Sequence, residues 1–298
     1  MRIDVKNFRM CFGDRTVIDD LSFVVEPGET FGLLGSNGSG KTTTLRALLG
    51  MWPATAGELL IDGRPFVPGH GARVGYLPEE RGLYRKDAAL DVMVYFAEIK
   101  GIGRVRARAW STDYLERVGL ADKSRLKLEK LSGGQQQKIQ LGIAMLGAPR
   151  LLILDEPAKG LDPVNRQLLM DLIAERQREG ATVILVTHNM DEVERLCDRA
   201  LLLRDGRAAA YGTISDIQKR FGSRKILVRT RRPVPESELY TIGDVVGGAR
   251  ELRPGLNVRD EEILEHLVRE GTQPTAFQAR PLSMDEVFVR VYGQKVSA

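Results

Sequence analysis

The residues best suited to chemistry lie at positions 35–42, which read GSNGSGKT. They follow a short apolar stretch, residues 30–34, and precede an expected helix over residues 42–49. A glycine-rich turn between a buried strand and a helix lets backbone N–H groups close around phosphate, and the helix dipole favours the anion. Lys41 would supply a cation to the β- and γ-phosphates, and Thr42 would offer its hydroxyl to Mg²⁺. The pattern predicts a nucleoside triphosphate site, although kinases, GTPases and motors share it.

Two carboxylates end a second apolar stretch, residues 151–156, which reads LLILDE. We expect Asp155 to hold Mg²⁺ directly or through water, and Glu156 to act as the base that polarises the attacking water. An ordinary strand that ends in a polar turn would have the same pattern by itself. The preceding phosphate loop favours the catalytic interpretation.

His188 follows an apolar stretch, residues 182–187, and therefore stands where ligands of α/β sheets bind. We expect it to contact the γ-phosphate, whereas a structural histidine is the alternative. His70 and His266 have no such context, and no role is assigned to them.

Residues 131–135 read LSGGQ and precede an expected helix over residues 136–146. The Ser132 hydroxyl and the two glycine N–H groups would form a second anion site at a helix N-terminus. This segment resembles the signature of the ABC ATPases. The order of motifs over residues 1–220 also resembles that family: phosphate loop, middle loop, signature, acidic strand, the Asp162 turn and His188.

The resemblance implies an α/β fold, with a P-loop NTPase (RecA-like) ABC ATPase core and a helical subdomain. In this family the signature of one subunit binds the γ-phosphate held by the phosphate loop of the other, so hydrolysis of ATP needs two subunits head to tail. Phe12 lies where the family places an aromatic residue that stacks on adenine; core packing is the alternative. Asp162, in GLDP, matches the loop that crosses the dimer interface.

The resemblance thus implies ATP and Mg²⁺ as cofactors and a set of site residues. The expected catalytic residues are Glu156 and His188, and the expected metal ligands are Thr42, Glu79 and Asp155. The expected nucleotide-binding residues are Phe12, Gly35, Ser36, Asn37, Gly38, Ser39, Gly40, Lys41, Thr42, Thr43, Ser132, Gly133, Gly134, Gln135 and Asp162.

Two residues depart from the family pattern. Glu79, in GYLPEERGLY, stands where the family usually has the glutamine that ligates Mg²⁺ and senses the membrane subunit. A carboxylate can still bind Mg²⁺, but it adds negative charge near the γ-phosphate. Lys159, in EPAKGLDP, stands where the family commonly has serine.

The stretch around Glu79 resembles a subgroup, the ABC-2-type exporter ATPases of the sodium-extrusion type. Residues 281–293, PLSMDEVFVRVYG, resemble the closing segment of a small C-terminal accessory domain found on many of them. The resemblance implies export through a separately encoded membrane-spanning permease, powered by a homodimer or by pairing with a second ATPase subunit.

The pattern of elements predicts two domains. Strands and helices alternate over residues 1–220 with a helical insert over about residues 82–140, which favours βαβ units and a parallel sheet. Residues 224–298 read as a small α+β domain, with a strand over residues 226–229, a helix that starts at Asp260 and a last strand–helix pair over residues 275–292.

Composition narrows the class of protein further. The net charge is +4 but Lys, Arg, Asp and Glu are mixed along the chain, so no nucleic-acid-binding tail is evident. The two cysteines, Cys11 and Cys197, form neither a disulfide framework nor a zinc motif, and a reduced cytosol is the expected compartment. Residues 1–10 lack the apolar core of a signal peptide, and no apolar run approaches the roughly 20 residues that span a bilayer.

These observations favour an ATPase coupled to transport, placed peripherally at the cytoplasmic face of the cell membrane. The first alternative is a soluble ABC ATPase that acts on nucleic acid or ribosomes, but such relatives usually carry two ATPase domains or a long coiled coil. The second alternative is a P-loop phosphotransferase, which would need an acceptor site in place of LSGGQ.

Overall fold

The computed structural model describes residues 1–67, 73–80, 82–222, 224–255 and 258–293. The chain divides into two compact units, Met1–Thr213 and Ile214–Ala298. The division lies before helix α7 (Ile214–Phe221), whereas the sequence placed a domain boundary after residue 220. The reason is that α7 packs against α9 (Met284–Gly293) of the second unit.

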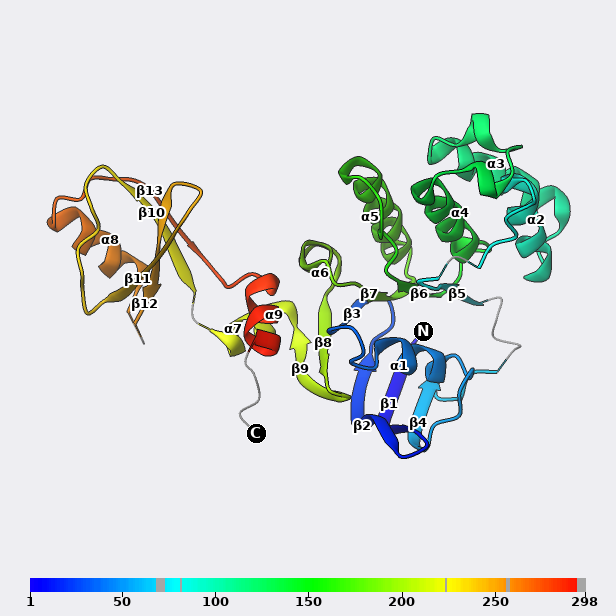
Figure 1. Cartoon of the computed structure of the whole chain (residues 1–298), viewed down its shortest axis with the longest axis horizontal. Helices are drawn as coiled ribbons and strands as arrows, with labels where there is room; N and C mark the ends of the chain where they lie inside the picture. Colours follow the sequence, from blue (N-terminus) through cyan, green and yellow to red (C-terminus); the bar gives the residue numbers. More distant parts are fainter. Residues whose placement is uncertain (68–72, 81, 223, 256–257, 294–298) are drawn as a thin grey trace. The chain divides into compact units, whose positions relative to one another are not determined.

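A six-stranded sheet forms the centre of the first unit (Figure 1). Its strands, in spatial order, are β5 (Val74–Leu77), β6 (Leu151–Asp155), β7 (Thr182–Val186), β3 (Thr30–Leu34), β8 (Arg199–Arg204) and β9 (Arg207–Thr213). The strands run parallel except β9, which is antiparallel to β8. Every residue of β3, β6 and β7 is buried, as the uniformly apolar sequences predict for parallel strands covered on both faces. The predicted α/β fold is confirmed.

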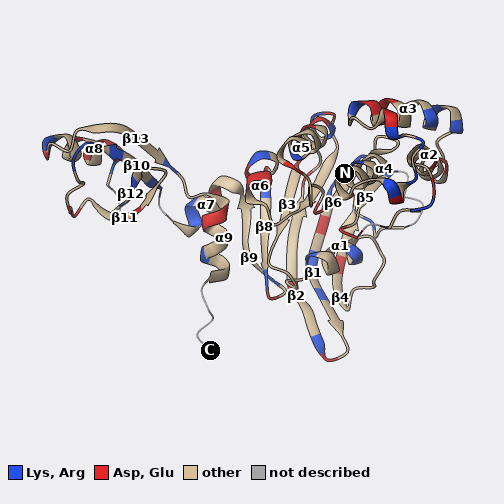
Figure 2. Cartoon of the chain, turned by 45° about the horizontal axis from the view of Figure 1, so that its top comes forward, with Lys and Arg blue, Asp and Glu red and all other residues tan. Residues whose placement is uncertain are grey.

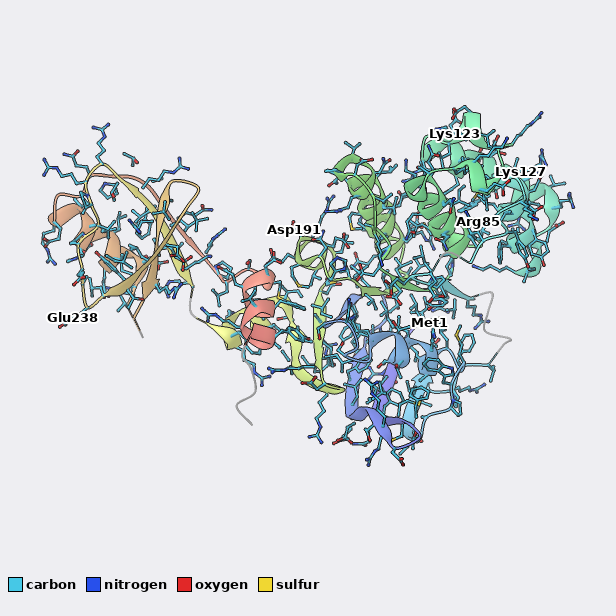
Figure 3. All side chains as sticks on the ribbon, viewed as in Figure 1. Met1, Arg85, Lys123, Lys127, Asp191 and Glu238 are labelled. Atoms are coloured by element: carbon cyan, nitrogen blue, oxygen red, sulfur yellow. The ribbon has the colours of Figure 1, made fainter. Side chains whose placement is uncertain are left out.

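An antiparallel sheet packs beside it, formed by β1 (Ile3–Phe12), β2 (Arg15–Val25) and β4 (Ala56–Ile61). The sequence predicts short strands around residues 3–8 and 21–25, and the β1–β2 hairpin extends well beyond both. Buried residues of both sheets form one hydrophobic core. The amino terminus belongs to this core, because Met1 is buried and its ammonium donates to Thr182 Oγ1 at 2.8 Å (Figure 3).

The helical insert lies next to the β5–β6 edge of the sheet in Figure 1. The helices of the first unit are α1 (Lys41–Leu48), α2 (Ala89–Ile99), α3 (Arg104–Arg117), α4 (Gly133–Met145), α5 (Pro163–Arg178) and α6 (Met190–Leu196), with 3₁₀ turns at Ala121–Lys123 and Leu128–Lys130. The buried Tyr114 hydroxyl donates to the Lys138 carbonyl at 2.7 Å, which joins α3 to α4. The helical spacing of Leu90, Val94, Phe96 and Ile99 predicts one apolar face on α2, but Ile99 is 62% exposed.

The second unit contains an antiparallel sheet in the order β11-β12-β10-β13. Its elements besides α7 and α9 are β10 (Lys225–Thr230), β11 (Tyr240–Val246), β12 (Ala249–Pro254), α8 (Asp260–Arg269) and β13 (Pro274–Arg280). The sequence predicts an apolar face on α8 that includes Ile263, Leu267 and Val268. Ile263 and Leu267 pack into the core, whereas Val268 is 60% exposed. The His266 ring meets the Tyr240 ring edge to face, with centroids 5.9 Å apart. His70 lies outside the described residues.

Charges of both signs are interspersed over the described elements, as along α3 in Figure 2. Within the described ranges, no helix combines the length and the apolar character that crossing a membrane requires.

A buried ion-pair network holds α9 against the sheet of the second unit. The Lys225 ammonium, only 5% exposed, contacts Glu251 Oε2 at 3.3 Å and also binds Glu286 at the start of α9. Glu286 additionally accepts from the backbone N–H of Ser283 at 2.8 Å. The lysine therefore neutralises two carboxylates that the fold brings together.

We expect Lys225→Ala to lower the unfolding free energy of the second unit by about 3 to 5 kcal/mol. Glu286 and the mostly buried Glu251 would both lose the lysine, and Glu251 would keep the exposed Arg253 at 2.9 Å. Urea unfolding of the full chain, followed by circular dichroism, measures this. Arg259→Ala is the matched control, since Arg259 makes an exposed pair with Glu262 at 2.7 Å that contributes little. An equal loss in both variants would contradict the assignment.

Candidate nucleotide site

The parallel register brings four loops to one edge of the central sheet. Leu77 of β5 is aligned with Leu154 of β6, Leu154 with Leu185 of β7, and Leu185 with Gly32 of β3. The chain leaves each strand within a few residues of this row. The segments that follow therefore meet at the carboxyl edge, where α/β sheets bind their ligands.

The phosphate loop, residues 35–40, connects β3 to α1 in a conformation that depends on glycine. Gly40 has φ +108°, and a Cβ there would lie 2.3 Å from Ile18 Cδ1. A Cβ at Gly35 would lie 2.4 Å from Ser39 Oγ and 2.6 Å from the Leu203 carbonyl. No side chain caps the N-terminus of α1, so its first N–H groups remain available to an anion.

Lys41 bends back over this loop. Its ammonium donates to the carbonyls of Gly35 at 2.9 Å and Ser36 at 3.0 Å. Burial lowers the pKa of Lys41, while the charges of Glu156, Asp155 and Glu79 act in the opposite direction. The cation is thus held at the mouth of the loop and faces the carboxylates of the neighbouring strands.

Three carboxylates, from Glu79, Asp155 and Glu156, share the space beside Lys41. Burial raises the pKa of Asp155 to about 6, and the negative charges of Glu79 and Glu156 add to the rise. Lys41 and a hydrogen bond from Thr42 oppose it. The buried Oδ2 atom of Asp155 has no hydrogen-bond partner in the structure. This excess of negative charge is the condition that a bound cation would relieve.

Glu156 and His188 form a pair at the ends of β6 and β7. His188 Nδ1 lies 2.8 Å from Glu156 Oε1, and the imidazole is exposed while the carboxylate is mostly buried. Glu156 has φ +52°, a left-handed conformation that is uncommon for glutamate. Its N–H nevertheless donates to the Val186 carbonyl at 2.8 Å, which anchors the strained residue to β7.

The two departures from the family pattern meet in space. Lys159 Nζ lies 2.6 Å from Glu79 Oε1, although the residues belong to different loops. Hydrogen bonding to Glu79 raises the pKa of Lys159, and the charges of Glu156 and Asp155 contribute further. Neither residue was linked to the other from the sequence.

The LSGGQ segment starts α4 with a capping box. Ser132 Oγ accepts from the Gln135 N–H at 3.3 Å, and Gln135 Oε1 accepts from the Ser132 N–H at 3.0 Å. The Gln135 side chain, expected at the nucleotide, is therefore engaged by its own helix. The exposed Ser132 hydroxyl and the N–H groups of the two glycines remain available to an anion.

Asp162 caps the following helix, α5. Its Oδ1 atom accepts from the Asn165 N–H at 2.9 Å, and Asn165 lowers the pKa of Asp162. Asp162 also lines a cavity of about 440 Å³ together with the LSGGQ segment. The other residues that line this cavity are Gly119, Leu120, Lys138, Gly160, Leu161 and Asn165. The signature and the Asp162 turn are thus neighbours, and no phosphate-loop residue lines the same cavity.

Phe12 is 45% exposed, which argues against the core-packing alternative. Its ring meets Trp52 edge to face with centroids 5.2 Å apart, and the Arg46 guanidinium lies 5.0 Å from the Trp52 ring. Sequence reasoning missed both of these neighbours. The signal that could have indicated this cluster was Arg46, a basic residue on α1 close to Lys41.

Gln137 was also missed. Its side-chain amide donates to the Pro157 carbonyl at 2.9 Å and to the Glu156 carbonyl at 3.3 Å. A glutamine buried on α4 thereby fixes the loop that carries Glu156. Its place two residues after LSGGQ gave no hint of this contact.

The oxygen atoms of Thr42, Glu79 and Asp155 are suitable ligands for Mg²⁺. Within the described residues, no group of three or more His, Cys, Asp or Glu side chains is arranged to hold a metal ion. Mg²⁺ is usually bound by one or two carboxylates together with water and substrate phosphates. The unpartnered Asp155 Oδ2, with Thr42 and Glu79 nearby, matches that requirement.

Comparison with known proteins gives the family. The model of the family described as ABC transporter matches residues 18–159. An uncharacterized ABC transporter ATP-binding protein of Methanocaldococcus jannaschii is 45% identical over 72% of this chain and 79% of its own. A linearmycin resistance ATP-binding protein of Bacillus subtilis is 30% identical over 98% of both chains. A Nod factor export ATP-binding protein of Paraburkholderia xenovorans is 32% identical over 99% of this chain and 98% of its own.

Solved structures agree. The ATP-binding subunit of an ABC transporter superposes with a TM-score of 0.68 at 29% identity, over 74% of this chain and 93% of that one. A dimeric post-hydrolysis ATP-binding cassette bound to ADP and Pi superposes with a TM-score of 0.64 at 22% identity, over 71% of this chain and 98% of that one, and it supports the fold. The chain belongs to the ATP-binding proteins of ABC transporters. It binds ATP, and its enzymatic activity is ATP hydrolysis coupled to transport.

We expect Asp155→Asn to raise the unfolding free energy of the nucleotide-free protein by about 1 to 3 kcal/mol at pH 7.5. The pKa of Asp155 is raised from 3.8 to about 6, so its ionisation destabilises the folded state. The stability that the protonated Asp155 carboxyl contributes is therefore fully present below pH 3.8 and is lost as pH rises through about 6. Unfolding at pH 7.5 and pH 5 should show a smaller gain at pH 5; a gain independent of pH would contradict this account.

Proposed function

We propose that this chain powers export through a separate membrane-spanning permease by forming an ATP-bound head-to-tail dimer. The observation that supports the proposal is that one unit presents two glycine-containing helix N-termini on different helices, α1 after the phosphate loop and α4 at the LSGGQ segment. The LSGGQ cavity has no phosphate-loop residue in its lining. A second copy would supply the missing surface, so that each ATP lies between the loop of one subunit and Ser132 of its partner.

The site residues have different roles in the hydrolysis of ATP. The phosphate loop and α1 bind the phosphates through backbone N–H groups, and Lys41 adds a cation. Glu156 accepts the proton of the attacking water, and His188 orients the Glu156 carboxylate and reaches the γ-phosphate. Asp155, Thr42 and Glu79 would hold Mg²⁺, which would neutralise charge on the phosphates. Phe12 stacks on adenine.

A cavity lined by acidic and aromatic residues is a suitable docking site for a loop of the permease. A cavity of about 330 Å³ on the helical insert is lined by Tyr84, Asp87, Asp91, Val92 and Tyr95. Tyr84 and Tyr95 are exposed and contact each other edge to face, with centroids 5.5 Å apart. A permease loop that carries apolar and basic residues would satisfy both the rings and the carboxylates. Docking there would hold the protein peripherally at the cytoplasmic face of the membrane.

Export is favoured by the relatives that match almost the whole chain. Their names refer to Nod factor export and linearmycin resistance. The small unit after Thr213 belongs to this shared length, and we propose that it is an accessory domain of exporter ATPases. The names of these two relatives refer to different compounds, although both match almost the whole chain. We therefore propose that the permease sets the substrate.

We expect Glu156→Gln to lower the ATPase rate by about 100- to 10,000-fold, because the amide cannot accept the proton of water. The variant should still bind ATP and accumulate as an ATP-bound dimer. Phosphate release and size-exclusion chromatography with light scattering measure the two effects.

Glu116→Gln, on the exposed surface of α3, is the control and should behave as wild type. Retained hydrolysis in Glu156→Gln would exclude Glu156 as the base. If the variant stays monomeric with ATP, the same experiment with the permease present decides whether closure needs that partner.

We expect Phe12→Ala to weaken ATP binding about tenfold, since stacking of a base on an aromatic ring contributes about 1 to 3 kcal/mol. Equilibrium binding of ATP measures the change. Tyr95→Ala removes a ring of nearly equal exposure, 46% against 45%, and should leave ATP affinity unchanged. Unchanged affinity in Phe12→Ala would remove Phe12 from the adenine site.

A further inference from the structure

Glu79 and Lys159 form an ion pair inside the nucleotide site. The 2.6 Å contact joins the loop after β5 to the loop after β6, across 80 positions of sequence. β5 and β6 are adjacent and parallel, so these two loops leave the sheet side by side. The pair is therefore a consequence of topology and bridges two separate elements of the site.

The surroundings of the pair are strongly acidic. Glu79 acts electrostatically on Asp155 and Lys41, and Lys159 is influenced by Glu156 as well as Asp155. Lys159 and Lys41 both interact electrostatically with these three carboxylates. Lys41 already donates to the phosphate-loop carbonyls, so the cation that contacts Glu79 is Lys159.

The pair is also free to separate. The Glu79 and Lys159 side chains are 44% and 55% exposed, and an ion pair between such side chains is weak. A divalent ion that binds carboxylate and phosphate oxygens together has a much larger attraction for Glu79 than a half-exposed ammonium has. An arriving Mg²⁺ would therefore displace the lysine.

We propose that Lys159 neutralises Glu79 in the nucleotide-free subunit, and that Glu79 exchanges Lys159 for Mg²⁺ when Mg·ATP binds. The released ammonium is then free to face the triphosphate. This inference rests on the proposed role of Glu79 as a Mg²⁺ ligand. As a consequence, Lys159 makes ATP binding depend less on Mg²⁺. The lysine shields Glu79 when the metal is absent, and the metal must displace the lysine when it binds.

A double-mutant cycle tests the exchange. The variants are Glu79→Gln, Lys159→Ser and the combination of both, each with wild type as reference. The probe is the β,γ-imido analogue of ATP, which is not hydrolysed, so the readout is binding and not turnover. Isothermal titration gives its dissociation constant in EDTA and in saturating Mg²⁺. The dissociation constant in EDTA divided by the dissociation constant in Mg²⁺ is the Mg²⁺ enhancement.

We expect Lys159→Ser to increase the Mg²⁺ enhancement by about two- to fivefold, the range typical of an exposed ion pair. Most of the change should come from weaker binding in EDTA, where the unshielded Glu79 repels the triphosphate. Glu79→Gln should decrease the enhancement, because a carboxylate ligand is lost and Lys159 is free in both conditions. In the Glu79→Gln background, Lys159→Ser should change both constants by the same factor and leave the enhancement unaltered.

Two results would overturn the exchange alone, and a third would also overturn the metal role of Glu79 on which it rests. An enhancement that Lys159→Ser leaves unchanged would mean that the lysine does not compete with Mg²⁺. An equal increase with and without Glu79 would mean that Lys159 acts independently of that carboxylate. Loss of enhancement in wild type itself would remove Mg²⁺ from the site, and with it the proposed metal role of Glu79.

Lys6→Ser is the matched control. Lys6 makes an exposed pair with Glu58 at 3.9 Å, with side chains 59% and 63% exposed, and it lies on β1. This variant removes the same charge and breaks the same kind of pair outside the nucleotide site. It should leave the Mg²⁺ enhancement at the wild-type value.

Discussion

Repulsion among Glu79, Asp155 and Glu156 is the constraint on which the nucleotide site depends. The parallel sheet brings these carboxylates to one edge. Burial is the main cause of the raised pKa of Asp155, and the negative charges of Glu79 and Glu156 raise it further. The fold tolerates this arrangement through nearby cations, Lys41 on the phosphate loop and Lys159 against Glu79. A site with this excess of negative charge accepts a metal–phosphate complex more readily than a free anion, which is the chemistry that an ATPase needs.

The same edge of the sheet is connected to the second anion site through the backbone. Gln137 of α4 donates to the carbonyls of Glu156 and Pro157, and the turn after them leads to Asp162. Asp162 caps α5 and lines the cavity at LSGGQ. Hydrogen bonds therefore link α4 directly to the loop that carries the proposed base.

Several features could not be anticipated because their signals are weak or depend on distant contacts. β8, β9, β11 and β12 were not expected; the Gly247–Gly248 pair between β11 and β12 was a usable hairpin signal. Ile99 and Val268 satisfied helical periodicity yet are exposed, since periodicity indicates a face and does not show where the covering element ends. The unit boundary lies before α7 because α7 packs on α9, a contact between segments remote in sequence.

The sequence by itself determined the phosphate loop, the signature, the acidic strand end and the class of fold. These features are local: the backbone conformations that Gly35 and Gly40 permit, the apolar strands and the helix starts are encoded within a few residues. Only the tertiary structure decided which side chains meet. It paired Glu79 with Lys159, His188 with Glu156, and Gln137 with the Glu156 loop. Those contacts arise from strand order and register, and the pattern within any single segment does not contain that information.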